Sequence, residues 1–553
     1  MLKSNKIGWH YLLIAISIIA FWRLLFRYAV NVPWFDDVEV FPGAVVIWIK
    51  SSLWEGIKEL FRPNNEHRML PGKLAGVLCY ELTGQLNMRW LILVANLNLM
   101  GILWLFWQFF KKQNLTPFYF LPVCLFLLQP QFYLTSHWSI TAWQHQSVLF
   151  WGFFTVHLLS KNTQKSFFWA ILTGFIATFS LSSGLFFWVA GAAVLLFQAR
   201  YKNLLAWLVL MGVAAWLYFY GFNNAANNNG LAYFWQHLEE SLFGFFTFFG
   251  GAFDFWQQLP ILKRAILPTI MGFLLVSFCA WWFWGIIQQV FAQIKKPNLS
   301  KMLQPEQLFL VGCLVFLACN GSIIALLRPR FGYFVMLVGN YKIYPALLLA
   351  FGYLILITKT KNLRVLAIVL GFSLLFNVAS YWKFTPEVAE RRQMMLANAY
   401  NQQYNAIGLA AEIHSDFAKY IDYQMQYLTN HQAYFYPQIF DKKILEDTVG
   451  NGLMEIKITP SKNLIILENT TFEKGKEIND GAYLMLKSAK RMYLVACKQP
   501  VYVGKNPFKE AKGFITTIQA KNYEPDTYKV FVLEIAEKKQ TVFKTNQQIL
   551  INF

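Results

Sequence analysis

Charged residues are scarce in this chain of 553 residues. They make up 14% of it, whereas 56% of the residues are hydrophobic and 18% are aromatic. Soluble domains carry roughly 25% charged residues, so the composition excludes an ordinary water-soluble globular protein. The apolar residues form long runs between residues 8 and 382, whereas residues 383–553 read like a soluble domain. We therefore predict two parts, an apolar part that contacts membrane lipid and a soluble part that contacts water.

Cysteine is also sparse, with six residues in all. Only Cys497 lies in the soluble part, which excludes a disulfide framework or a cysteine-based zinc site there. The chain also lacks a phosphate-binding P-loop, an internal repeat and a low-complexity tract. The other five cysteines lie in or near apolar runs: Cys79, Cys124, Cys279, Cys313 and Cys319.

Acidic residues are fewer than basic ones, 29 against 49, which gives a formal charge of +20. Such a balance is typical of nucleic-acid binding, but here the Lys and Arg residues cluster in short segments between apolar runs. That placement is typical of membrane topology signals. We predict no nucleic-acid partner.

The apolar runs predict a polytopic α-helical membrane protein. A helix needs about 20 apolar residues to cross a hydrocarbon core of about 30 Å, and on that criterion we predict about eleven transmembrane helices. The basic start lacks a small-residue cleavage site, so we expect the first helix to be retained. The predicted crossings are residues 8–28, 89–110, 117–135, 143–160, 166–181, 184–199, 203–221, 265–289, 306–327, 338–357 and 363–381.

The basic clusters predict the orientation. If the N-terminus faces the cytoplasm, every cytoplasmic segment contains Lys or Arg, as the positive-inside rule expects. An odd number of crossings then places the C-terminal domain outside, in the periplasm of a Gram-negative cell. We therefore predict a multi-pass protein of the bacterial inner membrane. The basic segments are Lys3/Lys6, Lys111/Lys112, Lys161/Lys165, Arg200/Lys202, Lys295/Lys296/Lys301 and Lys359/Lys361/Arg364.

The predicted domains are a transmembrane part over residues 1–382, a helical connector over 383–435 and an extracytoplasmic β-rich part over 436–553. The connector has helical composition with few breakers apart from Gly408. The last part contains short alternating runs such as MEIKI, NLIIL, AYLML, MYLVA and KVFVLEI, which indicate a small β-sandwich within a soluble α+β domain. Between crossings, residues 231–258 predict an amphipathic interfacial helix.

Two adjacent carboxylates, Asp36 and Asp37, follow directly on the first predicted helix. A charge at a membrane surface is costly unless it is paired or acts on something. Partly desolvated among Trp34 and Phe35, such a carboxylate would have a raised proton affinity and could serve as a general base. The alternative is an ordinary acidic loop outside a helix, and both interpretations stay open.

A polar box, Asn-Asn-Glu-His-Arg, follows about thirty residues later and ends at Arg68. It places Glu66, His67 and Arg68 immediately before another apolar helix, where ionisable groups are rare. Adjacent Glu and His residues cannot both point at one ion from a regular helix, so we predict no metal site here. Taken singly, His67 is also compatible with an interfacial or capping role.

Together these motifs resemble the membrane glycosyltransferases of the GT-C class. Protein mannosyltransferases and lipid A aminoarabinose transferases have an acidic pair after the first helix and a His-Pro-Pro box later in the loop. They then have a short helix, a Gly turn and an Arg before the second crossing, as in LTGQLNMRW here. This chain has Asn-Glu-His-Arg in place of His-Pro-Pro and looks more like bacterial members that carry that box. The motif match covers Asp36 to Arg89.

The resemblance implies an inverting glycosyltransferase. The donor would be a polyprenyl-phosphate sugar in the membrane lipid, and the acceptor a glycan, lipid or protein at the outer face. Asp37 or Asp36 would take the acceptor proton, and we prefer Asp37. No cofactor is certain: oligosaccharyltransferase-like members use a divalent cation, whereas the mannosyl and arabinosyl types do not, so a cation stays possible.

Basic and aromatic groups complete the predicted site. We predict that Arg328, Arg330 and Lys342 contact the donor phosphate together with the polar box, although interfacial Arg residues also act as anchors. His137 and Trp138 suit a sugar face and its hydroxyls, although aromatic belts share that composition. We further expect Asp37, His67 and Lys342 to line one outward cavity.

Two other classes compete with the enzyme. A transporter or flippase of a lipid-linked or small polar substrate would also use polar groups in membrane helices, but we find no repeated half with matching broken helices. A non-catalytic scaffold that anchors the outer domain would not require the grouping of Asp36 and Asp37 with the polar box. We therefore favour the glycosyltransferase. We assign the C-terminal domain to acceptor binding or positioning.

Overall fold

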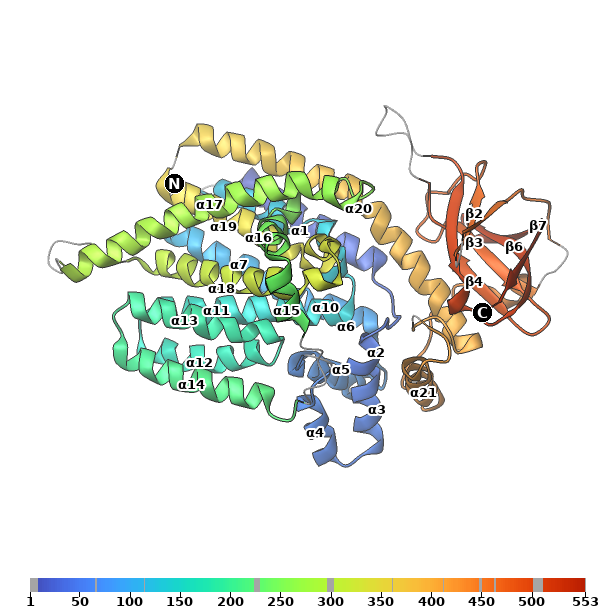
Figure 1. Ribbon diagram of the computed structural model, residues 1–553, viewed down its shortest axis with the longest axis horizontal. Helices are drawn as coiled ribbons and strands as arrows, with labels where there is room; N and C mark the ends of the chain where they lie inside the picture. The colour runs from blue at the N-terminus through green and yellow to red at the C-terminus, as the bar shows by residue number, and fades with distance from the viewer. Residues whose placement is uncertain are drawn as a thin grey trace, which may run out of the picture. The chain divides into compact units, whose positions relative to one another are not determined.

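The computed structural model describes residues 8–64, 67–113, 115–222, 229–295, 303–360, 362–410, 412–446, 450–461, 464–500 and 511–552. The chain is mostly helical and ends in β-strands (Figure 1). Its contacts divide it into two compact units. The helical unit is Met1–Phe26, Leu60–Leu74 and Ile92–Thr385, and the β-containing unit is Arg27–Glu59, Ala75–Leu91 and Pro386–Phe553.

Within the described residues, eight helices have the length and apolar composition needed to cross a bilayer. A membrane protein is therefore the class of molecule that the helices fit. Each of the eight coincides with a predicted crossing. They are Trp9–Tyr28, Met88–Lys112, Pro117–Ser136, Tyr201–Phe219, Ile261–Gln293, Pro305–Leu327, Gly339–Lys359 and Leu363–Asn405.

The other three predicted crossings coincide with shorter helices. They are α11 (Ser147–Ser160, 14 residues), α12 (Gln164–Thr178, 15 residues) and α13 (Phe186–Phe197, 12 residues). These helices pack on one another and on α14 (Tyr201–Phe219), and Figure 1 shows all four side by side. Gly184 permits the tight turn between α12 and α13, because a Cβ there would lie 2.0 Å from the carbonyl oxygen of Ala177. The number of crossings stays a prediction.

One apolar segment of the helical unit is broken repeatedly. Helix α8 (Leu121–Leu127) ends before Pro130, and short turns of helix follow. Gln129 begins the first of these turns, where its side chain accepts a hydrogen bond from the backbone N–H of Gln131 at 2.6 Å. Irregular backbone inside an apolar unit is tolerated where protein groups satisfy it. The pieces are η1 (Pro117–Phe120), η2 (Pro130–Phe132), α9 (Tyr133–Ser136), α10 (Ser139–Thr141) and the π-helix η3 (Ala142–Gln146).

The remaining helices include the segments between the apolar ones. The predicted interfacial helix over 231–258 is helical in two pieces that break at His237, followed by a short turn. These pieces are α15 (Asn229–Gln236), α16 (Leu238–Phe249) and η5 (Gly251–Phe253). The others are α1 (Trp9–Tyr28), α2 (Asp37–Val40), α3 (Pro42–Lys50), α4 (Leu53–Phe61), α5 (Leu70–Thr83), α6 (Met88–Ala95), α7 (Leu97–Lys112), η4 (Ser182–Leu185), α17 (Ile261–Lys295), α18 (Pro305–Leu327), η6 (Pro329–Phe331), η7 (Tyr333–Leu337), η8 (Gly339–Tyr341) and α19 (Ile343–Lys359).

Helix α20 (Leu363–Asn405) runs without interruption through the predicted boundary at residue 382. It contains Pro386 and ends where Ala406 adopts a positive φ of 57°. Helix α21 (Asp416–Asn430) follows, with Ser415 as its N-cap. Residues 383–435 are thus mostly helical, with a break around Gly408. The β-containing unit also includes residues 27–59, and α3 packs on α21 within it.

The C-terminal β-strands form two antiparallel sheets, which agrees with the predicted two-layer β domain. One sheet has the order β1-β2-β5 and the other β4-β3-β6-β7. The predicted runs correspond to β1 to β4 and β6, whereas β5 and β7 lie outside them. The strands are β1 (Lys457–Ser461), β2 (Leu464–Asn469), β3 (Gly481–Lys487), β4 (Met492–Ala496), β5 (Phe514–Gln519), β6 (Asp526–Ala536) and β7 (Lys539–Ile551); α22 (Lys442–Glu446) precedes them and η9 (Ala520–Asn522) follows β5.

Strand β3 is buried on both faces. Leu484 and Leu486 join the core between the sheets, whereas Tyr483 and Met485 pack against Ala397 of α20 and Leu445 of α22. Successive side chains of a strand point to opposite faces, so one strand supplies both cores. The C-terminal turns of α20 therefore belong to the β domain.

Some sequence predictions concern residues outside the described part of the chain. These are Glu66 of the polar box and the basic residues Lys3, Lys6, Lys296, Lys301 and Lys361.

Candidate functional site

The carboxylate pair lies at a tight turn in the β-containing unit. Phe35, just before the pair, has a positive φ of 49°, a conformation that bulky side chains rarely adopt. Its backbone N–H donates to the carbonyl of Leu409 at 3.3 Å, and the Trp34 ring lies 4.2 Å from the guanidinium carbon of Arg391. Such strain costs about 1–3 kcal/mol and persists where surrounding contacts impose it. The turn is thus held in place from the connector.

Asp37 is part of the turn itself. Its side chain is buried, with 1% exposed, and its Oδ2 accepts a hydrogen bond from the backbone N–H of Trp34 at 3.0 Å. The backbone N–H of Asp37 donates in turn to the carbonyl of Trp34 at 3.1 Å. Asp37 therefore closes the turn that places Asp36 next to it.

Asp36 has a different environment. It stands at the N-cap of α2 but makes no capping hydrogen bond, and its carboxylate has no hydrogen bond or ion pair within the described residues. The side chain is half-buried. Burial raises the pKa of Asp36 above its usual value of 3.8. A partly desolvated carboxylate with free lone pairs can accept a proton.

Arg68 of the polar box lies in the helical unit, and its guanidinium makes hydrogen bonds to backbone carbonyl groups. Its guanidinium donates to the backbone carbonyls of Tyr218, Phe61 and Tyr220, the first at 2.6 Å. Tyr218 and Tyr220 lie at the C-terminal end of α14, where a cation complements the helix dipole. Burial lowers the pKa of Arg68. Arg68 therefore holds a helix end, and its donors face carbonyl groups.

His67 lies beside a second polar group. Its backbone exchanges two hydrogen bonds with Asn64, at 2.8 and 2.9 Å. His67 and Arg328 both lie within electrostatic range of His145, which belongs to the π-helix η3. Nδ1 of His145 lies 2.8 Å from the hydroxyl of Tyr344. Two predicted residues, His67 and Arg328, thus gather near one buried histidine.

Arg328 and Arg330 flank Pro329 at the end of α18, as the sequence indicated. Both side chains are half-buried, and both guanidinium groups lie near the Phe331 ring, at 5.9 and 4.7 Å from its centre. Arg328 is the C-cap residue of α18. The two cations therefore stand close together at one helix end.

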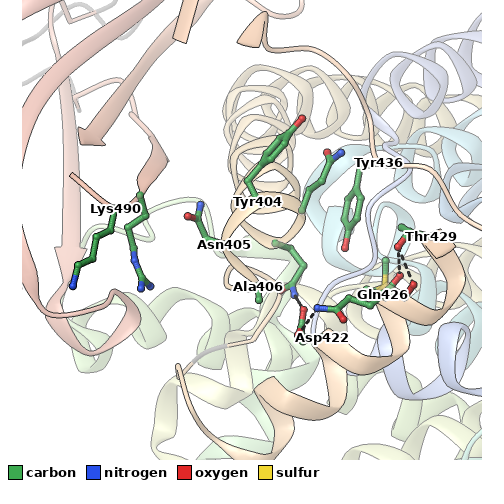
Figure 2. Close-up of a pocket in the computed structure, with 12 residues that line it drawn as sticks. Tyr404, Asn405, Ala406, Asp422, Gln426, Thr429, Tyr436 and Lys490 are labelled. Carbon is green, nitrogen blue, oxygen red and sulfur yellow. Dashed lines mark hydrogen bonds between the residues drawn. The ribbon is translucent and has the colours of Figure 1, made fainter. Parts of the chain in front are cut away.

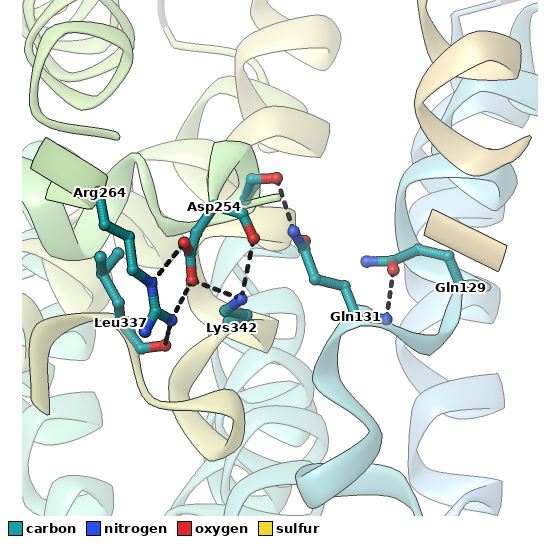
Figure 3. Close-up of polar contacts among 7 residues, drawn as sticks. Gln129, Gln131, Asp254, Arg264, Leu337 and Lys342 are labelled. Carbon is teal, nitrogen blue, oxygen red and sulfur yellow. Dashed lines mark hydrogen bonds and ion pairs between the residues drawn. The ribbon is translucent and has the colours of Figure 1, made fainter. Parts of the chain in front are cut away.

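Lys342 takes part in a buried ion triad of the helical unit. Its Nζ lies 2.8 Å from Oδ2 of Asp254, and the guanidinium of Arg264 donates to both carboxylate oxygens, at 2.7 and 2.5 Å (Figure 3). The exposed fractions of the side chains are 0% for Asp254, 1% for Lys342 and 17% for Arg264. Two cations share one carboxylate, so the triad keeps a formal charge of +1.

Electrostatics of the triad favour the ionised carboxylate. Burial by itself would raise the pKa of Asp254, but the hydrogen bonds and charges of Arg264 and Lys342 hold that pKa below its usual value. Sequence analysis did not single out Asp254 as a site residue. The signal was a carboxylate ten residues before Arg264 in an aromatic segment, but its pairing with Lys342, 88 residues away, depends on the fold.

Buried polar side chains surround the broken helix. His137 is 7% exposed, and its Nδ1 lies 2.9 Å from the hydroxyl of Ser136, whereas Trp138 is half-buried. Nε2 of Gln131 donates to the carbonyl of Ala252 at 2.8 Å, which links the break to the loop of Asp254 (Figure 3). The break therefore places polar groups inside an apolar unit.

Polar atoms without partners also lie at this break. Within the described residues, Nε2 of Gln129, Oε1 of Gln131 and Oγ of Ser139 are buried and make no hydrogen bond. Unpaired buried polar atoms are uncommon in native structures, and they indicate a bound polar group or water.

The predicted residues fall into two groups. Asp36 and Asp37 belong to the β-containing unit, and His67, Arg68, His137, Trp138, Arg328, Arg330 and Lys342 belong to the helical unit. A common cavity for Asp37, His67 and Lys342 stays a prediction. No group of three or more His, Cys, Asp or Glu residues that could hold a metal ion occurs in the described part of the chain.

Comparison with known proteins adds no further assignment: no family model, curated protein or solved structure matches this chain.

Proposed function

We propose that this protein is an inverting glycosyltransferase that moves a sugar from a polyprenyl-phosphate donor to an acceptor. The observation that carries the proposal is Asp36, a half-buried carboxylate that follows the first apolar helix in the chain and has no partner in the described residues. A general base needs a free lone pair and a pKa moved toward the working pH. Asp36 has both features, whereas Asp37 is used in the turn, so we assign the base to Asp36.

The proposed reaction is a single displacement. An acceptor hydroxyl attacks the anomeric carbon while the Asp36 carboxylate takes the hydroxyl proton. The bond between the anomeric carbon and the phosphate oxygen breaks, and polyprenyl phosphate leaves with the bonding electron pair. Attack opposite the leaving group inverts the anomeric centre.

The leaving phosphate needs positive charge. Arg328 and Arg330 of the helical unit stay the predicted phosphate contacts, and both guanidinium groups lie near the Phe331 ring. Arg residues bind phosphate through paired N–H donors. Arg68 and Lys342 instead support the structure around them.

The proposal places the reaction at the periplasmic face of a bacterial inner membrane, with a cytoplasmic N-terminus. The basic segments between the apolar helices support this orientation. A lipid-linked donor would then reach the enzyme from within the bilayer, and no nucleotide would be required.

The test is sugar transfer by the purified full-length protein in lipid nanodiscs. We would measure release of polyprenyl phosphate from a panel of polyprenyl-phosphate sugars, with bacterial membrane extract as the acceptor source. Wild-type protein should consume at least one donor, and Asp36→Asn should not. Glu39→Gln, on the same short helix, is the matched control and should keep its activity.

One observation supports a second candidate, a transporter or flippase. The broken helix with unpaired buried polar atoms resembles the interrupted helices that line substrate paths in transporters. Reconstituted liposomes distinguish the two functions. Movement of a lipid-linked sugar across the bilayer without bond cleavage, unaffected by Asp36→Asn, would favour transport.

A further inference from the structure

A cavity of about 520 Å³ lies within the β-containing unit (Figure 2). Its walls come from the end of α20, from α21 and from the turn between β3 and β4. Its volume falls within the roughly 300–1,000 Å³ that small-molecule sites occupy. None of its lining residues belongs to the site proposed for sugar transfer. The residues that matter most are Gln402, Tyr404, Asp422, Gln426, Tyr436 and Lys490.

Asp422 is the acidic group of this cavity. Its Oδ2 accepts a hydrogen bond from Nε2 of Gln426 at 2.8 Å, and Nε2 of Gln402 lies 3.5 Å from its Oδ1. It forms no ion pair within the described residues. Burial raises the pKa of Asp422, and the two amide donors oppose that rise. The carboxylate is therefore oriented by neutral amides and keeps lone pairs for a ligand.

Tyr436 supplies a phenol that the fold does not use. The residue is 8% exposed, and its side chain lines the cavity (Figure 2). Its hydroxyl has no hydrogen-bond partner in the described part of the chain. Burial, together with the nearby charge of Asp422, raises the pKa of this phenol. The hydroxyl is therefore available to a polar ligand in the cavity.

The rim of the cavity adds an aromatic face and cations. Tyr404 is 44% exposed and stands on the last turn of α20. Lys490 is exposed and forms no ion pair with any described residue, whereas Arg491 pairs with Glu524 at 3.2 Å. An exposed ring beside amide and carboxylate groups matches a sugar, which has one apolar face and a rim of hydroxyls.

We propose that this cavity binds a saccharide. Asp422 accepts hydrogen bonds from sugar hydroxyls, the Tyr436 hydroxyl and the side-chain amides of Gln403 and Asn405 complete the polar contacts, and the Tyr404 ring covers the apolar face. Hydroxyl-to-carboxylate hydrogen bonds are among the stronger polar contacts, since the acceptor is charged. The inference goes beyond the proposed transfer reaction and depends on different residues.

The experiment measures binding alone, with no donor present. Full-length protein in nanodiscs would be titrated with soluble trisaccharides of glucose, mannose, galactose, N-acetylglucosamine and galacturonic acid. Wild-type protein should bind at least one of them saturably. Tyr436→Phe and Asp422→Asn should each weaken that binding by about tenfold or more, a loss of about 1.4 kcal/mol or more. Tyr436→Phe removes a hydroxyl that has no partner, so its unfolding temperature should not fall.

Matched controls are available on α21. Tyr427→Phe removes a phenol and Asp416→Asn removes a carboxylate, both outside the cavity, and both should bind as the wild type does. Absence of binding by every trisaccharide would overturn the inference, and so would wild-type affinity in either cavity variant. Because no transfer is measured, failure here leaves the assignment of Asp36 to its own test.

Discussion

Two acidic residues from different units of this molecule, Asp254 and Asp36, meet opposite environments. Asp254 is completely buried in the helical unit, and two cations occupy its carboxylate. Asp36 is half-buried in the β-containing unit and has no partner within the described residues. The pKa of Asp254 is lowered and that of Asp36 is raised. Burial alone therefore does not identify a reactive carboxylate.

The contrast separates structure from chemistry. A buried charge that is paired and hydrogen-bonded is strongly needed for stability, because removal of one partner leaves the others uncompensated. A partly buried charge without partners contributes nothing to stability and carries a desolvation cost, which is a reason to look for function. Loss of Asp254 should thus change folding, and loss of Asp36 should change activity.

The largest expected effect is on catalysis. Asp36→Asn should lower kcat/KM for sugar transfer by about 10² to 10⁴-fold, the range for removal of a general base. Its unfolding free energy should stay the same or rise slightly, because the variant removes a desolvated charge. Transfer assays and denaturation of the same preparation test both parts. Full activity in Asp36→Asn, with loss in Asp37→Asn, would move the base to Asp37.

The second effect is on stability. Asp254→Asn should lower the unfolding free energy by about 3–5 kcal/mol, because Lys342 and Arg264 lose their shared carboxylate in a buried place. Chemical denaturation in detergent micelles measures the change. Glu306→Gln is the control: it breaks the 3.4 Å pair with Lys112, whose side chain is 47% exposed, and should cost less than about 1 kcal/mol. Equal losses of unfolding free energy in the two variants would contradict the view that the buried triad matters more for stability than the exposed pair.

Sequence patterns predicted the local structure well and the long-range pairing poorly. Helices occur at every predicted crossing because a run of about 20 apolar residues is typical of a helix long enough to cross a bilayer. Strand β7 was missed because its run KQTVFKTNQQILI is mostly polar, as edge strands often are. Composition also could not show where α20 ends, because the part that serves the β domain continues the last apolar helix.

In the candidate site, too, the sequence predicted local features but not contacts between distant residues. Asp36 and Asp37 were recognisable as acidic residues next to an apolar helix, but their different roles depend on the turn at Phe35. Arg68 was predicted to meet phosphate, yet it contacts the carbonyl of Tyr218, 150 residues away. Spacing along the chain does not report such contacts, so a basic residue beside a membrane helix cannot be assigned from sequence alone.

A buried side chain without charge, Asn401 of α20, can be compared with the two carboxylates. It donates to the carbonyl of Leu494 at 2.7 Å and accepts from the Leu494 N–H at 2.8 Å. These bonds satisfy backbone groups of the edge strand β4. Asn401→Ala should therefore lower the unfolding free energy by about 1–3 kcal/mol. Asn405→Ala, which removes one bond to Met492, should cost less. Sugar transfer should survive both changes at temperatures where the variants stay folded, and its loss would tie this edge to activity.

The smallest effect is the pH dependence, about tenfold in rate per pH unit, or about 1.4 kcal/mol. Asp36 must be ionised to act as a base, so kcat/KM should rise with pH through its raised pKa and level off above it. This rise of kcat/KM with pH should be absent from the residual activity of Asp36→Asn. Stability should move the opposite way, since a raised pKa in the folded chain means that the unfolding free energy falls as pH rises from about 3.8 to that pKa.

Asp254 supplies the opposite sign at lower pH. Its stabilising contribution is present above the unfolded pKa of about 3.8 and is lost as pH falls through its lowered folded pKa. Denaturation of wild type and Asp254→Asn over this acid range should therefore converge as pH decreases. The two carboxylates would then titrate in separate windows, Asp254 seen only in stability and Asp36 mainly in rate. An acid limb in kcat/KM that depended on Asp254 and not on Asp36 would reverse the roles assigned to them.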